Sequence, residues 1–118
     1  MNKLLAAGLL AALVAPAAWA HAVLKAATPA SGAAVPAGVH ELRLTFNEPL
    51  EAGFCKIQVT DGGAKAVAVK AVKAVDGDPT SLVVPLEAAV APGTYTVRWS
   101  AMGHDGHRTK GDYKFTVK

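Results

Sequence analysis

The sequence predicts an all-β fold, and three observations support that prediction. After residue 20, apolar and polar residues alternate in short runs. Clusters of glycine, proline and aspartate separate these runs about ten residues apart. The one helical candidate, 87–91, is enclosed by Pro85 and Pro92. About seven short strands in roughly 100 residues favour an immunoglobulin-like, Greek-key β-sandwich or barrel.

The alternation assigns the strands in order along the chain. We expect strands at residues 22–27, 41–46, 55–60, 67–72, 82–84, 94–99 and 112–117. The run at 94–99 is the clearest, because Tyr95, Val97 and Trp99 share one face while polar residues share the other. Turn signals lie at 61–63 and 76–79, where aspartate, glycine and proline cluster.

Residues 1–20 have the pattern of a cleavable signal peptide. Lys3 precedes an apolar run from Leu4 to Val14, and Ala18-Trp19-Ala20 has the small residues of a cleavage site. The apolar run is too short to span a membrane, and nothing later in the chain is longer. We expect export to the periplasm, with residues 21–118 as one soluble domain that begins at His21.

Composition narrows the classes of function. The formal net charge is +3 at pH 7, and the cations are scattered rather than gathered in a long basic block, which argues against nucleic-acid binding. Cys55 is the single cysteine, so it cannot form an internal disulfide, and we expect it to be a small buried residue. His40 has no partner at useful spacing and is expected on the surface. No nucleophile–base pair indicates catalysis, so a binding function is favoured.

A histidine at a free N-terminus offers two nitrogens, its α-amine and its ring Nδ1, which together can close a chelate ring on a metal ion. The amine has an ordinary pKa of about 8, so a metal can displace its proton near neutral pH. Copper(II) favours tetragonal nitrogen and oxygen ligands and stands first in affinity among the divalent first-row metals. His21 therefore predicts a copper(II) site.

The loop Gly103-His104-Asp105-Gly106-His107 carries further ligand types. Asp105 and His107 are two residues apart, so they share one side of an extended segment, and Gly106 between them permits unusual torsions. We expect His107 to supply a third nitrogen, and Asp105 either to supply an oxygen or to orient a ligating ring. His104 should face away. The plain alternative is a polar turn that joins the last two strands.

The sequence resembles the CopC family of periplasmic copper-binding proteins over essentially all of residues 21–118. The motifs that carry the resemblance are His21-Ala22, Pro29 within Thr-Pro-Ala-Ser-Gly, Leu42 to Pro49 (LRLTFNEP), Pro92 to Trp99 (PGTYTVRW), Asp105 to Gly111 (DGHRTKG) and Tyr113 to Val117 (YKFTV). The resemblance implies an immunoglobulin-like barrel or sandwich with a copper(II) site built from His21, Asp105 and His107. It also implies Glu48 as a further ligand or neighbour, although Glu48 can equally be a surface charge before a proline turn.

The resemblance further implies a role and a partner. The chain would be a carrier or buffer in copper homeostasis or resistance, monomeric, passing copper to a CopD-type inner-membrane protein. One feature departs from part of the family, because some members carry a methionine-rich loop suited to copper(I). Residues 21–118 contain Met102 alone. We therefore expect a single copper(II) site, with one copper per chain.

Two other functions compete with the carrier. One is a small copper-dependent oxidative enzyme, because polysaccharide monooxygenases also hold copper with an N-terminal histidine and a second imidazole on a β-sandwich. A domain of this size leaves little room for a substrate-binding face, and Asp105 would fill a position that such chemistry needs open. The other is a metal-free immunoglobulin-like interaction module, for which His21→Ala would leave the function unchanged.

Overall fold

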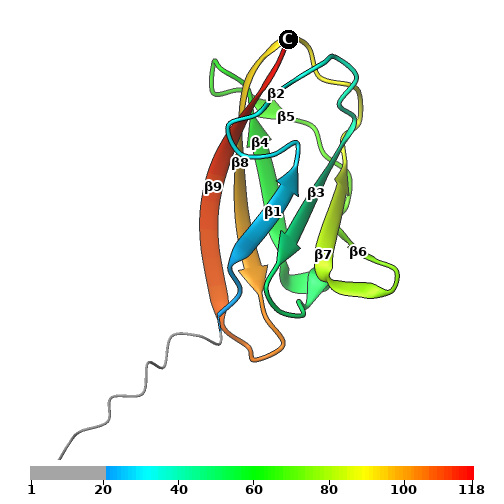
Figure 1. Cartoon of the computed structure of the whole chain (residues 1–118), viewed down its shortest axis with the longest axis vertical. Helices are drawn as coiled ribbons and strands as arrows, with labels where there is room; N and C mark the ends of the chain where they lie inside the picture. Colours follow the sequence, from blue (N-terminus) through cyan, green and yellow to red (C-terminus); the bar gives the residue numbers. More distant parts are fainter. Residues whose placement is uncertain (1–20) are drawn as a thin grey trace, which may run out of the picture.

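The computed structural model describes residues 21–118, which form two β-sheets packed face to face (Figure 1). The predicted signal peptide, residues 1–20, lies outside this range. The strands are β1 (Leu24–Thr28), β2 (Ala34–Val35), β3 (Glu41–Phe46), β4 (Lys56–Thr60), β5 (Ala66–Val67), β6 (Lys73–Val75), β7 (Asp78–Pro85), β8 (Gly93–Met102) and β9 (Arg108–Val117). Within residues 21–118 the only helix is a 3-10 turn, η2 (Ala52–Phe54). The predicted all-β sandwich is confirmed.

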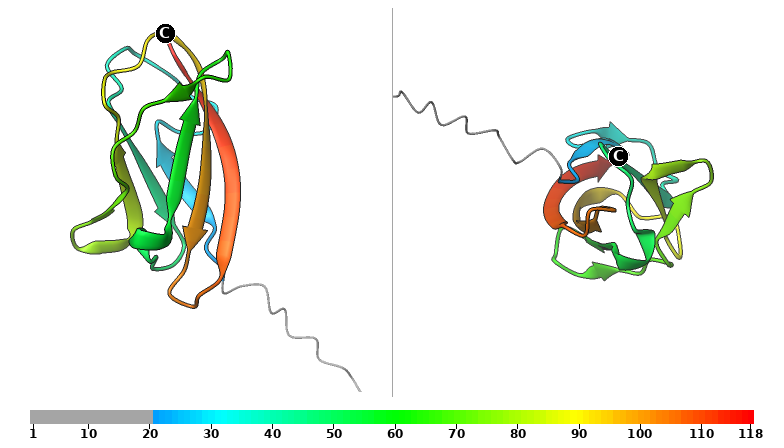
Figure 2. Two further views of the ribbon diagram at one scale, coloured as in Figure 1. Left: turned by 180° about the vertical axis from the view of Figure 1, so that it is seen from behind. Right: turned by 90° about the horizontal axis from the view of Figure 1, so that it is seen from below.

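One sheet has the strand order β1-β3-β7-β6, and the other has the order β2-β9-β8-β4-β5. Figure 2 shows the two sheets curving around a shared interior. The longest ladder joins β8 to β9 in antiparallel register, from Gly93 opposite Val117 to Met102 opposite Arg108. The loop that connects these two strands is therefore held on a long, fully paired hairpin.

The core lies between the sheets and follows the predicted alternation. Leu42, Leu44 and Phe46 of β3 are buried, as are Tyr95 and Val97 of β8. The remaining buried apolar residues are Ala22, Leu50, Cys55, Ile57, Val59, Leu82, Val84, Leu86, Ala101, Tyr113, Phe115 and Val117. Withdrawing these side chains from water supplies the main driving force for folding. The Cys55 thiol is free, and burial raises its pKa.

The single strand expected at 67–72 is wrong, because the chain changes sheets there. β5 ends at Val67 in the five-stranded sheet, and β6 begins at Lys73 in the four-stranded sheet. Between them, Val69 forms only an isolated bridge with Leu86. Alanine and valine recur on both sides of the crossover, at 66–69 and again at 71–75, so the composition does not mark where the chain changes sheets.

Three smaller differences concern the ends of strands. The first strand covers Leu24–Thr28 rather than 22–27. The two-residue strand β2 was not predicted, because a pair of residues running parallel to β9 is too short to show alternation. The turn expected at 76–79 is narrower, since Asp76 and Gly77 alone join β6 to β7, with Gly77 in the left-handed region at φ 77°.

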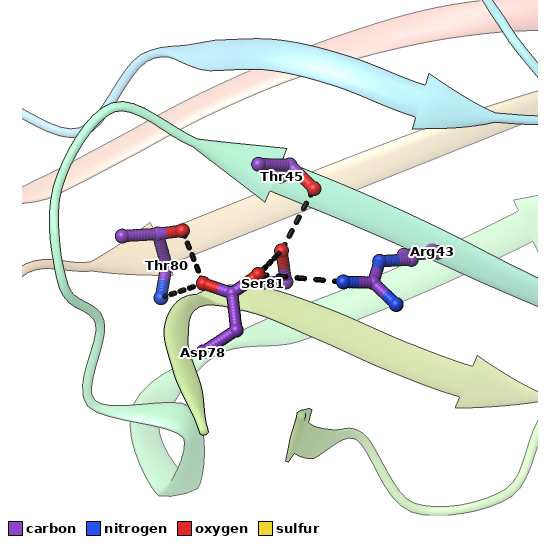
Figure 3. Close-up of polar contacts among 5 residues, drawn as sticks. All are labelled: Arg43, Thr45, Asp78, Thr80 and Ser81. Carbon is purple, nitrogen blue, oxygen red and sulfur yellow. Dashed lines mark hydrogen bonds and ion pairs between the residues drawn. The ribbon is translucent and has the colours of Figure 1, made fainter. Parts of the chain in front are cut away.

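A polar network ties β3 to the start of β7 (Figure 3). Asp78 accepts hydrogen bonds from the Thr80 hydroxyl at 2.6 Å and from the Ser81 hydroxyl at 2.7 Å. Because Ser81 gives its only proton to the carboxylate, the Thr45 hydroxyl donates to Ser81 at 2.8 Å. Arg43 lies 3.3 Å from the same carboxylate. These donors, Thr80 and Ser81 foremost, lower the pKa of Asp78 to about 2.

The two ends of the sandwich differ in what they carry. The start of β1 and the loop between β8 and β9 lie at one end, and the C-terminus lies at the other (Figures 1 and 2). The fold thus brings His21 to residues 103–107, although more than 80 positions separate them in the chain. Residues 21–118 contain no helix with the length and apolar character needed to cross a bilayer.

Candidate metal centre

The backbone around His21 is fixed by contacts from two other segments. Ala22 is 1% exposed, and its carbonyl accepts a hydrogen bond from the Thr109 hydroxyl at 2.8 Å. The Asn47 side chain accepts from the Val23 N–H at 2.8 Å and donates to the His21 carbonyl at 3.4 Å. These bonds hold the start of the domain against β3 and β9, so the His21 ring has a defined position.

The loop between β8 and β9 is closed by its own backbone. The Gly103 N–H donates to the His107 carbonyl at 3.1 Å, and the Gly106 N–H donates to the Gly103 carbonyl at 3.0 Å. Gly106 has a φ of 83°, a conformation that glycine adopts without steric cost. The His104 N–H is bound to the Pro49 carbonyl at 3.2 Å, which ties the loop to the segment after β3.

Three side chains converge at this end of the sandwich. His21, Asp105 and His107 each offer one ligand atom, and these atoms lie within 4.8 Å of one another. The two imidazoles stand edge to face, with ring centroids 4.7 Å apart and an interplanar angle of 85°. The His21 Nδ1 is buried and has no hydrogen-bond partner within residues 21–118. A buried nitrogen without a partner is costly unless a proton donor or a cation satisfies it.

Hydrogen bonds keep Asp105 ionised. Its Oδ1 accepts the His107 N–H at 2.9 Å, and its Oδ2 lies 3.2 Å from His107 Nδ1. Both contacts, the backbone one foremost, lower the pKa of Asp105. When Nδ1 of His107 carries the proton that the carboxylate accepts, its Nε2 is left with a free lone pair. Asp105 can therefore act either as a ligand or as the group that orients the His107 ring.

Glu48 approaches Asp105 but is not one of the three residues whose ligand atoms converge. The Glu48 Oε1 is buried, and no group in the described part of the chain forms a hydrogen bond with it. A Cβ built on Gly103 would collide with Glu48 Oε1 and would lie 2.9 Å from Asp105 Oδ1. The two carboxylates therefore approach the same point above Gly103. Two anionic groups in such proximity, one with an unsatisfied buried oxygen, form an arrangement that favours a cation.

Comparisons with known proteins identify the family of this chain. The model of the CopC domain matches residues 24–118. Copper resistance protein C of Escherichia coli is 36% identical over 124 aligned positions, which cover 100% of this chain and 98% of that protein. The chain belongs to the CopC family. Its relatives in that family from Escherichia coli and Pseudomonas syringae are named copper resistance protein C.

Two further CopC-family relatives extend the comparison. Protein YobA of Escherichia coli K12 is 41% identical over 106 residues, covering 90% of this chain and 86% of YobA. The crystal structure of PcoC, described as a methionine-rich copper resistance protein from Escherichia coli, superposes with a TM-score of 0.76 at 35% identity. That match covers 84% of this chain and 100% of PcoC. This CopC-family chain contains Met1 and Met102 alone.

The other two histidines lie apart from the converging three. His104 Nε2 is 3.5 Å from a Glu51 carboxylate oxygen, and both side chains are about half exposed. The His40 ring Nδ1 lies 3.0 Å from the Gly38 carbonyl, on an exposed residue. Both histidines thus lie where the sequence placed them, facing away from the cluster and on the surface.

Sequence reasoning missed the residues that support this cluster. Asn47 and Thr109 anchor the start of the domain, and Gly103 leaves room for Glu48. Asn47 stands directly before Glu48, within the motif that carries the CopC resemblance, but its contact with Val23 spans 24 residues. For Gly103 the sequence did offer a signal, because Gly103 and Gly106 stand on either side of His104 and Asp105.

Proposed function

We propose that this CopC-family protein is a periplasmic carrier or buffer of copper(II), exported with residues 1–20 removed, and that it holds one copper(II) per chain. In this proposal the ligands are the His21 amine and imidazole, His107 and Asp105, with Glu48 as a further ligand or neighbour. The observation that carries the proposal is the convergence of His21, Asp105 and His107 within 4.8 Å.

The donor set fits copper(II) better than other common metals. Nitrogen ligands from an amine and two imidazoles, with carboxylate oxygen, suit the tetragonal arrangement that copper(II) prefers. Zinc sites in proteins instead close a tetrahedron, often with cysteine, and Cys55 is buried among apolar side chains. A soft cluster for copper(I) would need thioethers or thiolates, and Met102 and Cys55 are the only sulfur-bearing residues of 21–118.

Each residue has a distinct part in holding the ion. The bonds from Asn47 and Thr109 preorganise His21, which limits the ordering cost of binding. Asp105 supplies negative charge at neutral pH and orients the His107 ring. Glu48 adds a second carboxylate, and a bound cation would satisfy its buried Oε1. The position at the end of the sandwich leaves copper open to collection by a CopD-type membrane protein, which we propose as the receiver.

The test is a copper(II) titration of the exported protein, with its N-terminus identified by mass spectrometry and electron paramagnetic resonance spectra recorded on the same samples. We expect one tight equivalent with a nitrogen-rich tetragonal signal. His21→Ala should weaken binding by roughly 100-fold or more, because it removes the imidazole and breaks the chelate. His40→Ala is the matched control and should bind as the parent does.

A second variant tests the contribution of the His21 α-amine separately from that of the imidazole. One alanine inserted before His21 keeps the imidazole but moves the α-amine away, so affinity should fall and the nitrogen coupling pattern should change. The proposal would be abandoned if copper bound equally tightly to the parent, His21→Ala and the extended protein. In that case the metal-free interaction module would become the better description.

A further inference from the structure

The outward face of β4, β8 and β9 carries a groove away from the metal-ligand cluster. The groove has a volume of about 400 Å³. Its lining residues are Lys56, Gln58, Arg98, Trp99, Ser100, Lys110, Gly111 and Asp112. The face belongs to the five-stranded sheet, and its strands are the central ones of that sheet rather than its edges. Along the groove β8 is paired on both sides, to β4 and to β9, so the floor of the groove presents side chains.

The strand register arranges these side chains in rows across the sheet. Ser100 lies between Lys56 on β4 and Lys110 on β9. The next row places Arg98 between Gln58 and Asp112. Adjacent rows are two residues apart along each strand, which is about 7 Å. An extended peptide laid along the groove repeats its same-side residues at that spacing.

The groove is strongly cationic. Lys56, Arg98 and Lys110 line it, and Arg108 in the adjoining row donates from Nη1 to Ser100 Oγ at 2.7 Å. None of these four cations has an ion-pair partner among the described residues 21–118. Asp112 is the single acidic residue in the lining. Unpaired cations gathered in a concave surface concentrate field lines and attract an anionic partner.

We propose that this groove docks an extended, carboxylate-rich segment of a partner protein. Charge complementarity requires the occupant to be anionic, and the row spacing matches alternate side chains of an extended chain. A bilayer surface fits less well, because a flat layer of headgroups reaches protruding side chains rather than the interior of a groove. The groove also lacks the series of aromatic platforms on which single-stranded nucleic acid stacks, since Trp99 is its only aromatic residue.

The groove lies near the loop between β8 and β9, so a docked partner would be close to the metal-ligand cluster. Lys110 of the lining lies three residues after His107, so the groove is close to the end of the β8–β9 loop. A segment docked there would hold its parent protein beside the cluster of His21, Asp105 and His107. The link to copper delivery rests on the proposed function, but the docking itself needs no metal.

The test uses copper-free exported protein and a synthetic peptide of about ten residues that alternates glutamate with threonine. Binding is measured by isothermal titration calorimetry, because the Trp99 indole packs against Phe46 rather than among the outward cations. The peptide should bind, and binding should weaken as salt is added. The triple variant Lys56→Glu, Arg98→Glu, Lys110→Glu should weaken binding by at least about tenfold.

The matched control reverses three cations elsewhere, with the same change in net charge: Lys65→Glu, Lys70→Glu, Lys73→Glu. Its affinity should stay within about threefold of the parent. Equal losses in the two triples would overturn the proposal, because net charge alone would then explain binding. Groove-dependent binding of phosphatidylglycerol vesicles without binding of the peptide would also overturn it, in favour of a membrane surface.

Two further measurements keep the result interpretable. If the glutamate triple fails to fold by circular dichroism, the corresponding glutamine triple replaces it, and it should also weaken binding relative to the parent. Copper(II) titration of both triples should match the parent, because none of the substituted residues belongs to the metal-ligand cluster. Loss of peptide binding with intact copper binding separates this proposal from the proposed function.

Discussion

Gly103 is the residue on which the approach of the two carboxylates depends. Its torsions lie outside the left-handed region, so the requirement for glycine is one of space. In Gly103→Ala the new methyl group would displace the Glu48 carboxylate and crowd Asp105. We expect copper(II) affinity to fall by about 10–100-fold, the range for disturbing groups around a metal ligand, as measured by competition with a chelator.

Gly53→Ala is the control for that substitution. Gly53 lies in η2, where an added Cβ meets nothing within 4 Å. This control should keep the parent's affinity, and both variants should keep the parent's circular dichroism spectrum. An unchanged affinity in Gly103→Ala would mean that Glu48 moves aside freely and has no part in holding the ion.

Asp78 predicts a pH dependence of stability. Its pKa is about 2 in the folded protein, below the ordinary value near 4 of an unfolded chain. The ionised carboxylate therefore stabilises the fold above about pH 4, and this contribution is lost as the pH falls from about 4 to 2. Asp78→Asn should be less stable than the parent at pH 7, with the gap closing by pH 2, in urea unfolding series. Glu87→Gln, at an exposed position, should show no such convergence.

At the scale of elements, the β8–β9 hairpin depends on Gly111. The Trp99 indole covers Gly111 so closely that a Cβ there would lie 2.7 Å from Trp99 Cε2. The same ring meets Phe46 edge to face, with centroids 5.1 Å apart, so it has little room to retreat. Gly111→Ala should cost about 1–3 kcal/mol, or roughly 4–24 °C in Tm by calorimetry.

The companion variant for this hairpin is Gly62→Ala, whose added Cβ would make an ordinary contact of 3.7 Å with the Thr94 carbonyl. Its Tm should stay within a few degrees of the parent's. A similar Tm for Gly111→Ala and the parent would show that the indole shifts without penalty.

The elements also show where sequence patterning is informative. Strands such as β3 and β8 were predictable because one face is buried and the other exposed, which imposes a period of two. The short strands β2, β5 and β6 were not, because two or three paired residues cannot display a period. The crossover between sheets after Val67 depends on long-range pairing, which no local pattern encodes.

At the scale of the whole molecule, one copper ion held by His21 and by the β8–β9 loop should link the start of the domain to its last hairpin. An ion held by both segments stabilises the folded state alone, so Tm should rise with copper(II) concentration. At a free concentration about 100 times Kd the gain is about 2.7 kcal/mol, or roughly 10–20 °C. His21→Ala should lose most of this shift in differential scanning fluorimetry, and a chelator should reverse it in the parent. A full shift in His21→Ala would indicate binding elsewhere.

The candidate site was predictable in its residue types and only partly in its construction. His21, Asp105 and His107 stand out because metal ligands are recognisable from side-chain chemistry and spacing. Their support by Asn47, Thr109 and Gly103 was not foreseen, since each acts through a tertiary contact with a residue distant in sequence. The same holds for the cationic rows of β4, β8 and β9, which form only when the strands pair.

The shortness of the outer strands has a consequence for how copies of this domain meet. Three of the four sheet edges, β2, β5 and β6, are only two or three residues long, and the fourth, β1, is interrupted by a bulge between Leu24 and Ala26. Strand-to-strand polymerisation needs a long, regular edge as a template. The outermost strands offer no such template, so pairing between copies would have to use the part of β9 that β2, paired only at Thr116 and Val117, leaves uncovered.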